Sequence, residues 1–392
     1  MRLHAGQLTF DDGYQAMRMP PYYPEPPNVP PINWKRWGQG ILIIISIFLL
    51  ITNIFWPKNT PNKTTLFWFT GFILPVLVYL LIFSIYYFIY QIRIYHKNVY
   101  FAVTEKDENE WWGYQSKYLP IIDTIIIGSL GRNQMDWAML IRNKTVPPFP
   151  KINDKTEVLC NPLLISNKEN KDKMLAKLLF NELDTKYPVS NLNIKHIYWL
   201  GSESALNVFS NLVVQQYNTS PISKGFIHSI KDIDDIIDNH YEHHHNDEKL
   251  IIAGTNLNDD PKRVVQSESG FLWLIGNTGN YAIHRCEAID CDNERVSDLT
   301  SQLKRYAGLP SAPALTISMD HKSAEAFTSS DWNSVDNNLS PYYGDVSLTS
   351  PFLAISQGVL HCIQNSIDSC GWTSNIIDNK HFAGVISRHE EK

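Results

Sequence analysis

Two long apolar runs near the N-terminus constrain this chain more than any other feature. They span Ile41–Trp56 and Leu66–Ile92, and a short stretch rich in proline, asparagine, lysine and threonine separates them. The second run has no formally charged side chain, and a helix of about 20 apolar residues is long enough to cross the hydrocarbon layer of a membrane. The first run reaches that length when Trp37–Gly40 is included. We therefore predict a transmembrane hairpin over residues 37–92.

A signal peptide and a buried core helix both fit these runs less well. A secretory signal peptide would lie closer to the N-terminus, whereas about forty residues precede the first run and no small-residue cleavage site follows it. A buried core helix is the second alternative, but two adjacent uncharged runs around a polar turn are uncommon in soluble domains. Four residues mark the expected hairpin: Trp37 and Trp56 as interfacial aromatics, Asn53 as a hydrogen-bonding group between the helices, and Pro75 as a break.

The basic residues around the runs indicate the orientation of the hairpin. Lysine and arginine are enriched in the cytoplasmic segments of membrane proteins. The basic residues and histidine at the outer ends are Lys35, Arg36, Arg93, His96 and Lys97, and those in the turn are Lys58 and Lys63. We therefore expect both termini in the cytoplasm. The abundance of asparagine, isoleucine and lysine, together with a two-helix anchor in the bilayer, favours a bacterial inner membrane.

Composition excludes one class of partner and suggests a reducing compartment. The formal net charge is −6 and acidic residues are spread along the chain, so the sequence has no basic footprint for nucleic acid. The five cysteines are odd in number and irregular in spacing, which suits reduced thiols better than a disulfide framework. No phosphate-cradling glycine loop or dinucleotide fingerprint is present, and we expect no cofactor.

The pattern divides the chain into four segments. We expect a proline-rich cytoplasmic tail at 1–36, the hairpin at 37–92, a juxtamembrane strand-rich region with a linker at 93–154, and a cytoplasmic α/β domain at 155–392. The tail is either a spacer or a polyproline-type docking peptide. Within the third segment, Asn98–Thr104 alternates like a strand and Ile121–Gly128 is typical of a buried strand.

Helical and strand patterns alternate through the last segment, which predicts a sheet covered on both faces by helices. Expected helices cover 172–183, 203–216, 230–240, 296–305 and 322–328, with a long apolar helix within 345–363; expected strands cover 196–201, 225–228, 249–255, 314–319 and 382–387. Gly270–Gly276 and Tyr281–Cys286 are expected to pair as a β-hairpin through a short turn.

Three pieces of this segment resemble the thiolase and β-ketoacyl-synthase superfamily. They are Leu250–Thr255, Ser269–Gly276 and Tyr343–Leu360. In that family an apolar strand ending in glycine precedes a strand pair, and a late segment of the Gly-Asp type opens a buried helix. The resemblance covers roughly residues 155–392 and implies a thiolase-like fold for them.

The sequence departs from that family at its catalytic residues. The family's nucleophilic cysteine opens a helix shortly before the apolar strand, whereas Ile222–Asn239 contains no cysteine. His321 and His361 lack the family's sequence context. The resemblance therefore implies a degenerate, non-catalytic, membrane-anchored member, similar to accessory proteins of bacterial type VI secretion loci that are thought to handle toxic effectors. It implies an effector or a secretion component as the protein partner.

The histidines that follow residue 239 are weak candidates for a metal site. His240, His243, His244 and His245 carry imidazoles suited to zinc, nickel or copper, and the first and third lie one helical turn apart. A solvated helix end, where histidine complements the helix dipole, accounts for the cluster better. The Cys286-x4-Cys291 pair is wider than the pairs of structural zinc sites and has no second pair. We expect no metal.

Two serines offer the most specific catalytic alternative. Ser202 and Ser204 follow a predicted strand in Gly201-Ser-Glu-Ser-Ala, which is similar to a nucleophile elbow but has alanine at the fifth position. A serine there needs a histidine and a carboxylate beside it, or else it caps the following helix. We expect a non-catalytic protein-binding factor. A membrane-tethered hydrolase or acyltransferase using these serines, and an immunity protein against a membrane-targeting toxin, are the alternatives.

Overall fold

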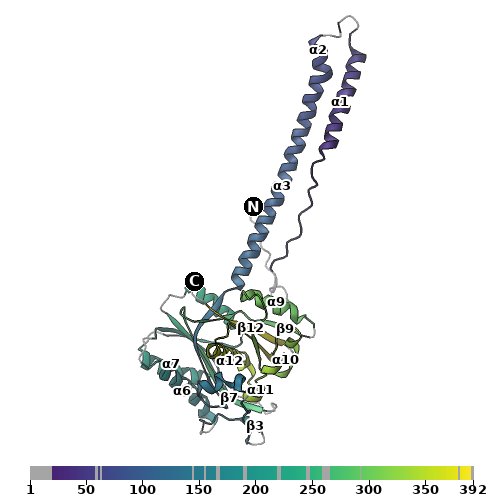
Figure 1. Cartoon of the computed structure of the whole chain (residues 1–392). Coiled ribbons are helices and arrows are strands. Elements are labelled where there is room, and N and C mark those ends of the chain that lie inside the picture. Colours follow the sequence, from purple (N-terminus) through teal and green to yellow (C-terminus); the bar gives the residue numbers. More distant parts are fainter. Residues whose placement is uncertain are drawn as a thin grey trace. The chain divides into compact units, whose positions relative to one another are not determined.

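The computed structural model describes residues 20–57, 61, 64–143, 145–153, 156–164, 168–188, 192–218, 222–243, 248–257, 265–291, 293–377 and 380–389. The chain forms two compact units that divide after Trp112. The first unit contains the predicted hairpin and the second contains a large sheet with its helices (Figure 1).

The predicted spans are helical in the structure. The first is α1 (Trp34–Phe55), and the second is built from α2 (Thr65–Trp68), a π-helical turn η1 (Phe69–Ile73) and α3 (Leu74–Gln115). The π-helical turn ends at Ile73, two residues before Pro75. A proline removes one backbone donor and clashes with the carbonyl four residues earlier, and a widened turn is one way for a helix to absorb this. The predicted break at Pro75 is therefore a local bulge within a continuous helical span.

Small residues let the two helices of the hairpin approach each other. A Cβ on Gly71 would lie 3.1 Å from Leu49, and a Cβ on Gly40 would lie 2.7 Å from the Tyr79 hydroxyl, which donates a hydrogen bond to the Trp37 carbonyl. Close approach at small residues is typical of packed membrane helices. Asn53 is exposed on α1, and its neighbour Thr52 is the residue that approaches Gly71.

Helix α3 corrects one sequence prediction. Asn98–Thr104 was predicted as a strand from its alternating side chains, but it continues α3 without a break. The i,i+4 ion pair between Lys106 and Glu110 supports this part of the helix. From Asn98 onward, the first residue that strongly disfavours helix is Gly113. Extending an existing helix is easier than nucleating a new element, and this outweighs the β-propensity of the segment.

The second unit is built on one mixed sheet of twelve strands. Along its main path the strands lie in the order β10-β11-β12-β8-β1-β7-β6-β4-β5, with β2, β3 and β9 attached at the sides. The strands are β1 (Tyr118–Ile127), β2 (Lys151–Asn153), β3 (Thr156–Leu159), β4 (Ile194–Leu200), β5 (Ser223–Phe226), β6 (Lys249–Leu257), β7 (Val265–Ile275), β8 (Tyr281–His284), β9 (Glu287–Asp290), β10 (Leu315–Ser318), β11 (Ser369–Ile377) and β12 (Lys380–Arg388).

Helices cover both faces of the sheet, as the alternation predicted. They are α4 (Gln134–Ala138), α5 (Leu140–Asn143), α6 (Lys168–Lys186), α7 (Glu203–Tyr217), α8 (Asp232–His243), α9 (Val296–Tyr306), α10 (His321–Thr328), α11 (Ser340–Tyr343) and α12 (Ser350–Asn365), with short 3-10 turns at Val335–Asn337 and Ser347–Thr349. Leu272 and Leu274 of β7 pack in the cluster of α6 and α7, whereas Phe271 and Trp273 pack in the cluster of α12 and α8. Strand residues that alternate between two cores fix the register of the sheet.

Strand β1 corrects two further predictions. Gly270–Gly276 and Tyr281–Cys286 were predicted to pair with each other, but β7 and β8 both pair antiparallel with β1 instead. Ile121 pairs with Ile275 of β7 and with Tyr281 of β8. The strand at 121–128 was placed in a separate juxtamembrane region, whereas it joins the main sheet of the second unit. The predicted segment over 93–154, which was expected to include a linker, also contains a short strand, β2, which pairs with β3.

Candidate functional site

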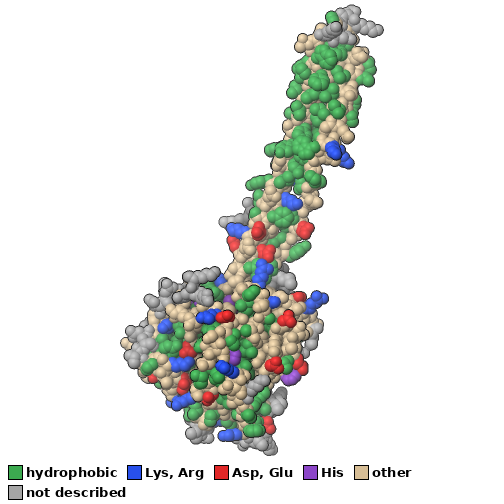
Figure 2. Space-filling view, in the orientation of Figure 1, with side chains coloured by type: hydrophobic (Ala, Val, Ile, Leu, Met, Phe, Trp, Pro, Cys, Tyr) green, Lys and Arg blue, Asp and Glu red, His purple; other side chains and the backbone are tan. Residues whose placement is uncertain are grey.

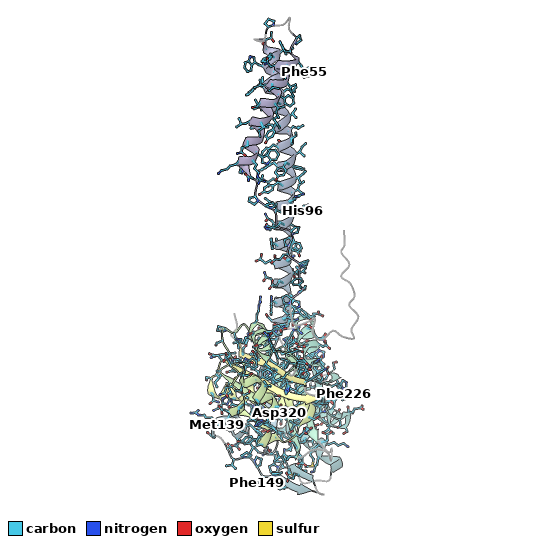
Figure 3. The ribbon with its side chains drawn as sticks, turned by 90° about the vertical axis from the view of Figure 1, so that its right-hand side faces the viewer. Phe55, His96, Met139, Phe149, Phe226 and Asp320 are labelled. Carbon is cyan, nitrogen blue, oxygen red and sulfur yellow. The ribbon has the colours of Figure 1, made fainter. Side chains whose placement is uncertain are left out.

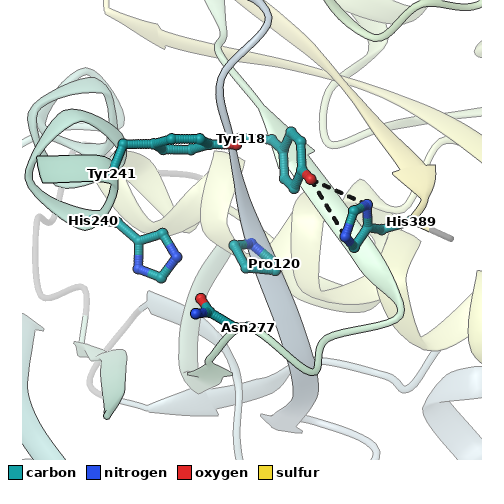
Figure 4. Close-up of a pocket in the computed structure, with 6 residues that line it drawn as sticks. All are labelled: Tyr118, Pro120, His240, Tyr241, Asn277 and His389. Atoms are coloured by element: carbon teal, nitrogen blue, oxygen red, sulfur yellow. Dashed lines mark hydrogen bonds between the residues drawn. The ribbon is translucent and has the colours of Figure 1, made fainter. Parts of the chain in front are cut away.

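A polar pocket of about 300 Å³ opens where four segments of the second unit meet. Its lining residues are Tyr118, Pro120, His240, Tyr241, Asn277 and His389 (Figure 4). They come from the start of β1, the last turns of α8, the turn between β7 and β8, and the residue after β12. We call this the tyrosine–histidine pocket. Of the histidines considered from the sequence, His240 lies in it.

The register of the sheet brings the lining residues together. Tyr118 pairs with His284 across β1 and β8, and Arg388 pairs with Tyr281 across β12 and β8. The backbone amide of His389 donates to the Asn280 carbonyl at 2.7 Å, which holds the chain beside the β7–β8 turn. The turn and the end of β12 are more than 100 residues apart in the sequence. Only the pairing of β8 with both neighbours makes them adjacent.

Tyr118 is the central side chain of the pocket. Its hydroxyl lies 3.2 Å from Nδ1 and 3.3 Å from Nε2 of His389, so either imidazole tautomer can serve as its partner. The rings of His284 and Tyr241 lie 5.7 Å and 6.1 Å from the Tyr118 ring. Burial raises the pKa of Tyr241 to about 12. The pocket therefore presents phenol and imidazole groups that can donate or accept hydrogen bonds at neutral pH.

His284 forms the buried wall behind Tyr118. Burial, reinforced by His389, lowers the pKa of His284 to about 4. Its Nε2 lies 2.8 Å from the Ser387 hydroxyl, and its Nδ1 has no hydrogen-bond partner among the described residues. This imidazole is therefore neutral at pH 7, so it gives the pocket no positive charge.

A charged cluster holds α8 beside the pocket. Arg285, next to His284, is paired with Asp238 and lies 3.7 Å from Asp234 on the same helix. The guanidinium also stacks over the Tyr114 ring at 4.5 Å. Burial raises the pKa of Asp234 to about 7. Burial also opposes ionisation of Asp238, but hydrogen bonds from Tyr114 and Arg285 and the nearby positive charges lower its pKa overall.

The histidine and cysteine candidates do not form a metal-binding group in the part of the chain that the structure describes. Across those residues no group of three or more histidine, cysteine, aspartate or glutamate side chains is placed to hold a metal ion. His244 and His245, and the side chain of His243, lie outside the described residues. Cys286 is buried, which raises the pKa of its thiol well above the usual value, and Cys291 is half-buried. What this pocket offers is hydrogen bonding and ring contacts.

The two serines of the nucleophile-elbow alternative lie elsewhere, at the start of α7. Ser202 is the N-cap of α7, and its hydroxyl accepts from the Ala205 amide at 3.2 Å. The same hydroxyl donates to Asp172 and lies 3.0 Å from the Ser204 hydroxyl, and Thr255 donates to the other oxygen of Asp172. None of the hydrogen bonds described for either serine involves a histidine. The capping interpretation of Ser202 is confirmed.

A serine–histidine contact that the sequence analysis missed lies in the interior. Ser323 near the start of α10 donates to Asp320, and its hydroxyl lies 2.7 Å from Nδ1 of His381 on β12. Ser323 is 0% exposed and His381 is 5% exposed. In a hydrolytic triad the histidine stands between the serine and the carboxylate, whereas here the serine stands between the other two. The trio therefore forms a buried polar bridge between α10 and β12.

Apart from His240, the lining residues of the tyrosine–histidine pocket were also missed, and three of them show why. Tyr118, Asn277 and His389 lie in separate segments with no shared motif. Asn277 stood in the predicted turn, and His389 follows the predicted terminal strand. These were the only local signals.

No family model matches the sequence, and no curated protein matches it. Among solved structures, the fold is similar to a chain of the complex between a type II PKS acyl-carrier protein and its ketosynthase, with 10% identity and a TM-score of 0.49, over 70% of this chain and 99% of that one. It is similar to the ishigamide ketosynthase/chain length factor, with 7% identity and a TM-score of 0.48, over 70% of this chain and 100% of that one.

A third similar structure is the ketosynthase from module 1 of the bacillaene synthase of Bacillus amyloliquefaciens. It has 5% identity and a TM-score of 0.46, over 71% of this chain and 74% of that one. Membership of the thiolase and β-ketoacyl-synthase superfamily stays a prediction that rests on the sequence motifs.

Proposed function

We propose that this chain is a membrane-anchored, non-catalytic factor that binds another protein through its α/β unit. The observation that carries the proposal is the placement of the candidate nucleophiles. Ser202 caps a helix and bonds a carboxylate, and the histidine-bound Ser323 is fully buried. A serine nucleophile of the triad type needs a histidine within hydrogen-bond reach and access to substrate. Ser202 is exposed, but none of its described hydrogen bonds involves a histidine, whereas Ser323 has a histidine partner and no access to substrate.

The start of α8 supports the same conclusion. The superfamily resemblance predicts a nucleophile in this stretch before β6. Here Asp232 accepts hydrogen bonds from the backbone amides of His228 at 2.6 Å and Ser229 at 3.2 Å. A carboxylate therefore occupies the backbone donors at this turn, and its negative charge would oppose the formation of a thiolate or an alkoxide there.

The hairpin supports the anchoring part of the proposal. Both spans are helices long and apolar enough to cross a membrane, and their apolar side chains face outward, as Figure 2 shows in green along the helices of the first unit. We propose the bacterial inner membrane, with both termini in the cytoplasm, because the basic residues flank the outer ends of the spans.

The proposed contact site on the α/β unit is the tyrosine–histidine pocket. Aromatic side chains with a polar tip are enriched at the centres of protein interfaces, because they bury much area while keeping a hydrogen bond. Tyr118 and Tyr241 provide such groups, with imidazoles beside them. The resemblance to accessory proteins of type VI secretion loci favours an effector or a secretion component as the partner.

Purification of the full chain from detergent-solubilised membranes tests the proposal. We expect a secretion-spike component or an effector to co-purify with the wild type and with His321→Ala, a control at an exposed histidine on α10. We expect its loss with the double variant Tyr118→Phe/His389→Ala. If the double variant retained the same partners, the tyrosine–histidine pocket would not be the contact site.

The same preparation tests the two alternatives. Turnover of an ester or thioester substrate that is abolished by Ser202→Ala would contradict the non-catalytic proposal. Recovery of a membrane-targeting toxin, which the chain neutralises, would replace effector handling by immunity.

A further inference from the structure

A second pocket lies in the first unit, between the proline-rich segment and α3. The segment is extended from residue 20 to residue 33, and its inward-facing residues recur every third position. Tyr23, Pro26 and Val29 are partly buried and Ile32 is buried, whereas most residues between them are exposed. Three residues per turn is the period of a polyproline II helix. The segment therefore lies along α3 of its own chain with one defined face.

Two hydrogen bonds hold this segment in place. The Tyr100 hydroxyl donates to the Pro24 carbonyl at 2.6 Å, and the Tyr23 hydroxyl donates to the Asp107 carboxylate at 2.8 Å. Both partners on the helix lie beyond the apolar span, which ends at Ile92. Figure 1 shows the segment running beside α3 towards the start of α1.

The pocket has a volume of about 460 Å³ and a cationic wall. Its lining residues are Pro26, Pro27, Asn28 and Val29 from the segment and Arg93, His96, Lys97 and Tyr100 from α3. The spacing i, i+3, i+4 and i+7 places the four helical residues on one face of α3. Among the described residues that line the pocket there is no carboxylate. His96 is labelled on α3 in Figure 3.

The pocket begins where the apolar span ends. Tyr86, Tyr87 and Tyr90 precede it on α3, and tyrosine is enriched at the level of lipid headgroups. Arg93 follows Tyr90 by three residues, which is about 4.5 Å along a helix axis. If the hairpin spans the bilayer, as proposed above, the basic groups of the pocket lie within reach of the phosphate layer of the cytoplasmic leaflet.

We propose that this pocket binds the headgroup of an anionic phospholipid. Arg93 and Lys97 would pair with the phosphate, and the Tyr100 hydroxyl and the proline-rich segment would close the pocket around the headgroup. Basic pockets beside membrane helices bind acidic headgroups in this way, and the arginine fork fits phosphate oxygens. The proline-rich segment thereby gains a role as part of a lipid site, which is different from a free spacer.

The test uses the full chain purified in a neutral detergent. Phosphatidylglycerol and phosphatidylcholine are each titrated into the micelles, and the bound lipid is counted by mass spectrometry of the intact complex. We expect preferential binding of phosphatidylglycerol, and a loss of about 25-fold in its affinity in Arg93→Gln/Lys97→Gln, at about fivefold for each positive charge removed. Tyr100→Phe keeps every charge and removes the bond to Pro24; we expect a smaller loss of the same preference.

The matched control is Lys35→Gln/Arg36→Gln, which removes two positive charges at the start of α1 outside the pocket. Equal losses in both double variants would mean general charge attraction and would overturn the proposal. Displacement of phosphatidylglycerol by millimolar inorganic phosphate would assign the pocket to free phosphate instead. Resistance of each variant to alkaline extraction from membranes is measured separately, so a failure of anchoring is distinguished from a failure of lipid binding.

Discussion

The two units of this protein differ in the exposure of their apolar side chains. In the α/β unit, Phe271 and Trp273 of β7 are both 0% exposed. In the hairpin, Leu81 is 64% exposed and Phe88 is 66% exposed. None of the residues of α1 is buried. Neither helix can cover the apolar surface that the other exposes, because each contacts its partner along one side only.

This difference shows what each unit requires from its surroundings. Apolar surface costs about 25 cal/mol for each Å² that faces water, so the exposed apolar side chains of the hairpin carry a cost that the core side chains of the α/β unit avoid. Exposed apolar patches larger than a few hundred Å² mark interaction sites or membrane contact. The α/β unit carries its own core, whereas the hairpin exposes apolar surface of the kind that the proposed bilayer would cover.

Charges placed in the hairpin should have the largest effect. Leu77→Arg/Leu81→Arg places two charges at exposed positions near the middle of the second span, at a cost of about 3 kcal/mol each for membrane insertion. The matched variant Val99→Arg/Val103→Arg has the same spacing on the same helix beyond the span, where both valines are also exposed. We expect only the first variant to lose its membrane-bound fraction in alkaline extraction. If both variants were extracted to the same extent, the apolar span would not be what holds the protein in the membrane.

A cavity in the α/β core should come next. The Trp273 indole donates to the Ser356 hydroxyl at 2.7 Å and contacts the Phe352 ring. Trp273→Ala should lower the free energy of unfolding of the α/β unit by about 4 kcal/mol, because it leaves a cavity and removes the hydrogen bond from the indole to Ser356. Denaturant unfolding in detergent, followed by near-UV circular dichroism, measures this change. Leu81→Ala, at an exposed position in the hairpin, should leave that transition within about 0.5 kcal/mol.

Two titratable groups with shifted pKa values should change the stability of the α/β unit with pH in opposite directions. His284 titrates near 4 when folded and 6.5 when unfolded, so its contribution is present above pH 6.5 and is lost as the pH falls towards 4, by about 3 kcal/mol. Asp234 keeps its proton up to about pH 7 when folded, so stability falls as the pH rises from about 4 to 7. Its side chain is 33% exposed, and solvent screening reduces this change to about 2 kcal/mol.

The variants separate these two slopes. In Asp234→Asn the stability should rise with pH between 4 and 7, and in His284→Gln it should fall over the same range. Unfolding measured at pH 4.5, 5.5 and 6.5 provides the comparison. A common slope in both variants would show that these groups do not control the profile.

The smallest effect is expected at the helix cap. Ser202→Ala removes the side chain that accepts from the Ala205 amide, and losing an N-cap costs about 1 kcal/mol. Ser204→Ala should cost less, because Ser204 is not the N-cap. Thermal unfolding ranks the two variants, and a larger cost for Ser204→Ala would contradict the capping role.

The sequence was most informative where local chemistry decides the structure. The charge-free spans became α1 and the α2–α3 helical span, and the apolar stretch after Tyr343 became α12, whose residues Ser350–Cys362 are all buried. The strand pattern at 249–255 became β6. Length and hydrophobic period determine these elements with little help from distant contacts.

The remaining features depend on contacts between distant parts of the chain. No pattern near residue 118 indicates that β1 separates β7 from β8, because that pairing joins residues about 150 positions apart. The tyrosine–histidine pocket depends on this insertion, since Tyr118 reaches His389 only through β8. The segment at 98–104 was predicted wrongly because its side chains suit a strand, while the helix before it determines its conformation.

Reporter fusions test the central claim, that a two-helix anchor holds the α/β unit at the cytoplasmic face of a membrane. Alkaline phosphatase, active only outside the cytoplasm, and green fluorescent protein, fluorescent inside it, are each fused after residue 60 and after the C-terminus. We expect phosphatase activity only at residue 60 and fluorescence only at the C-terminus, with all fusions in the membrane fraction. Phosphatase activity at the C-terminus, or fusions that stay in the soluble fraction, would contradict the account.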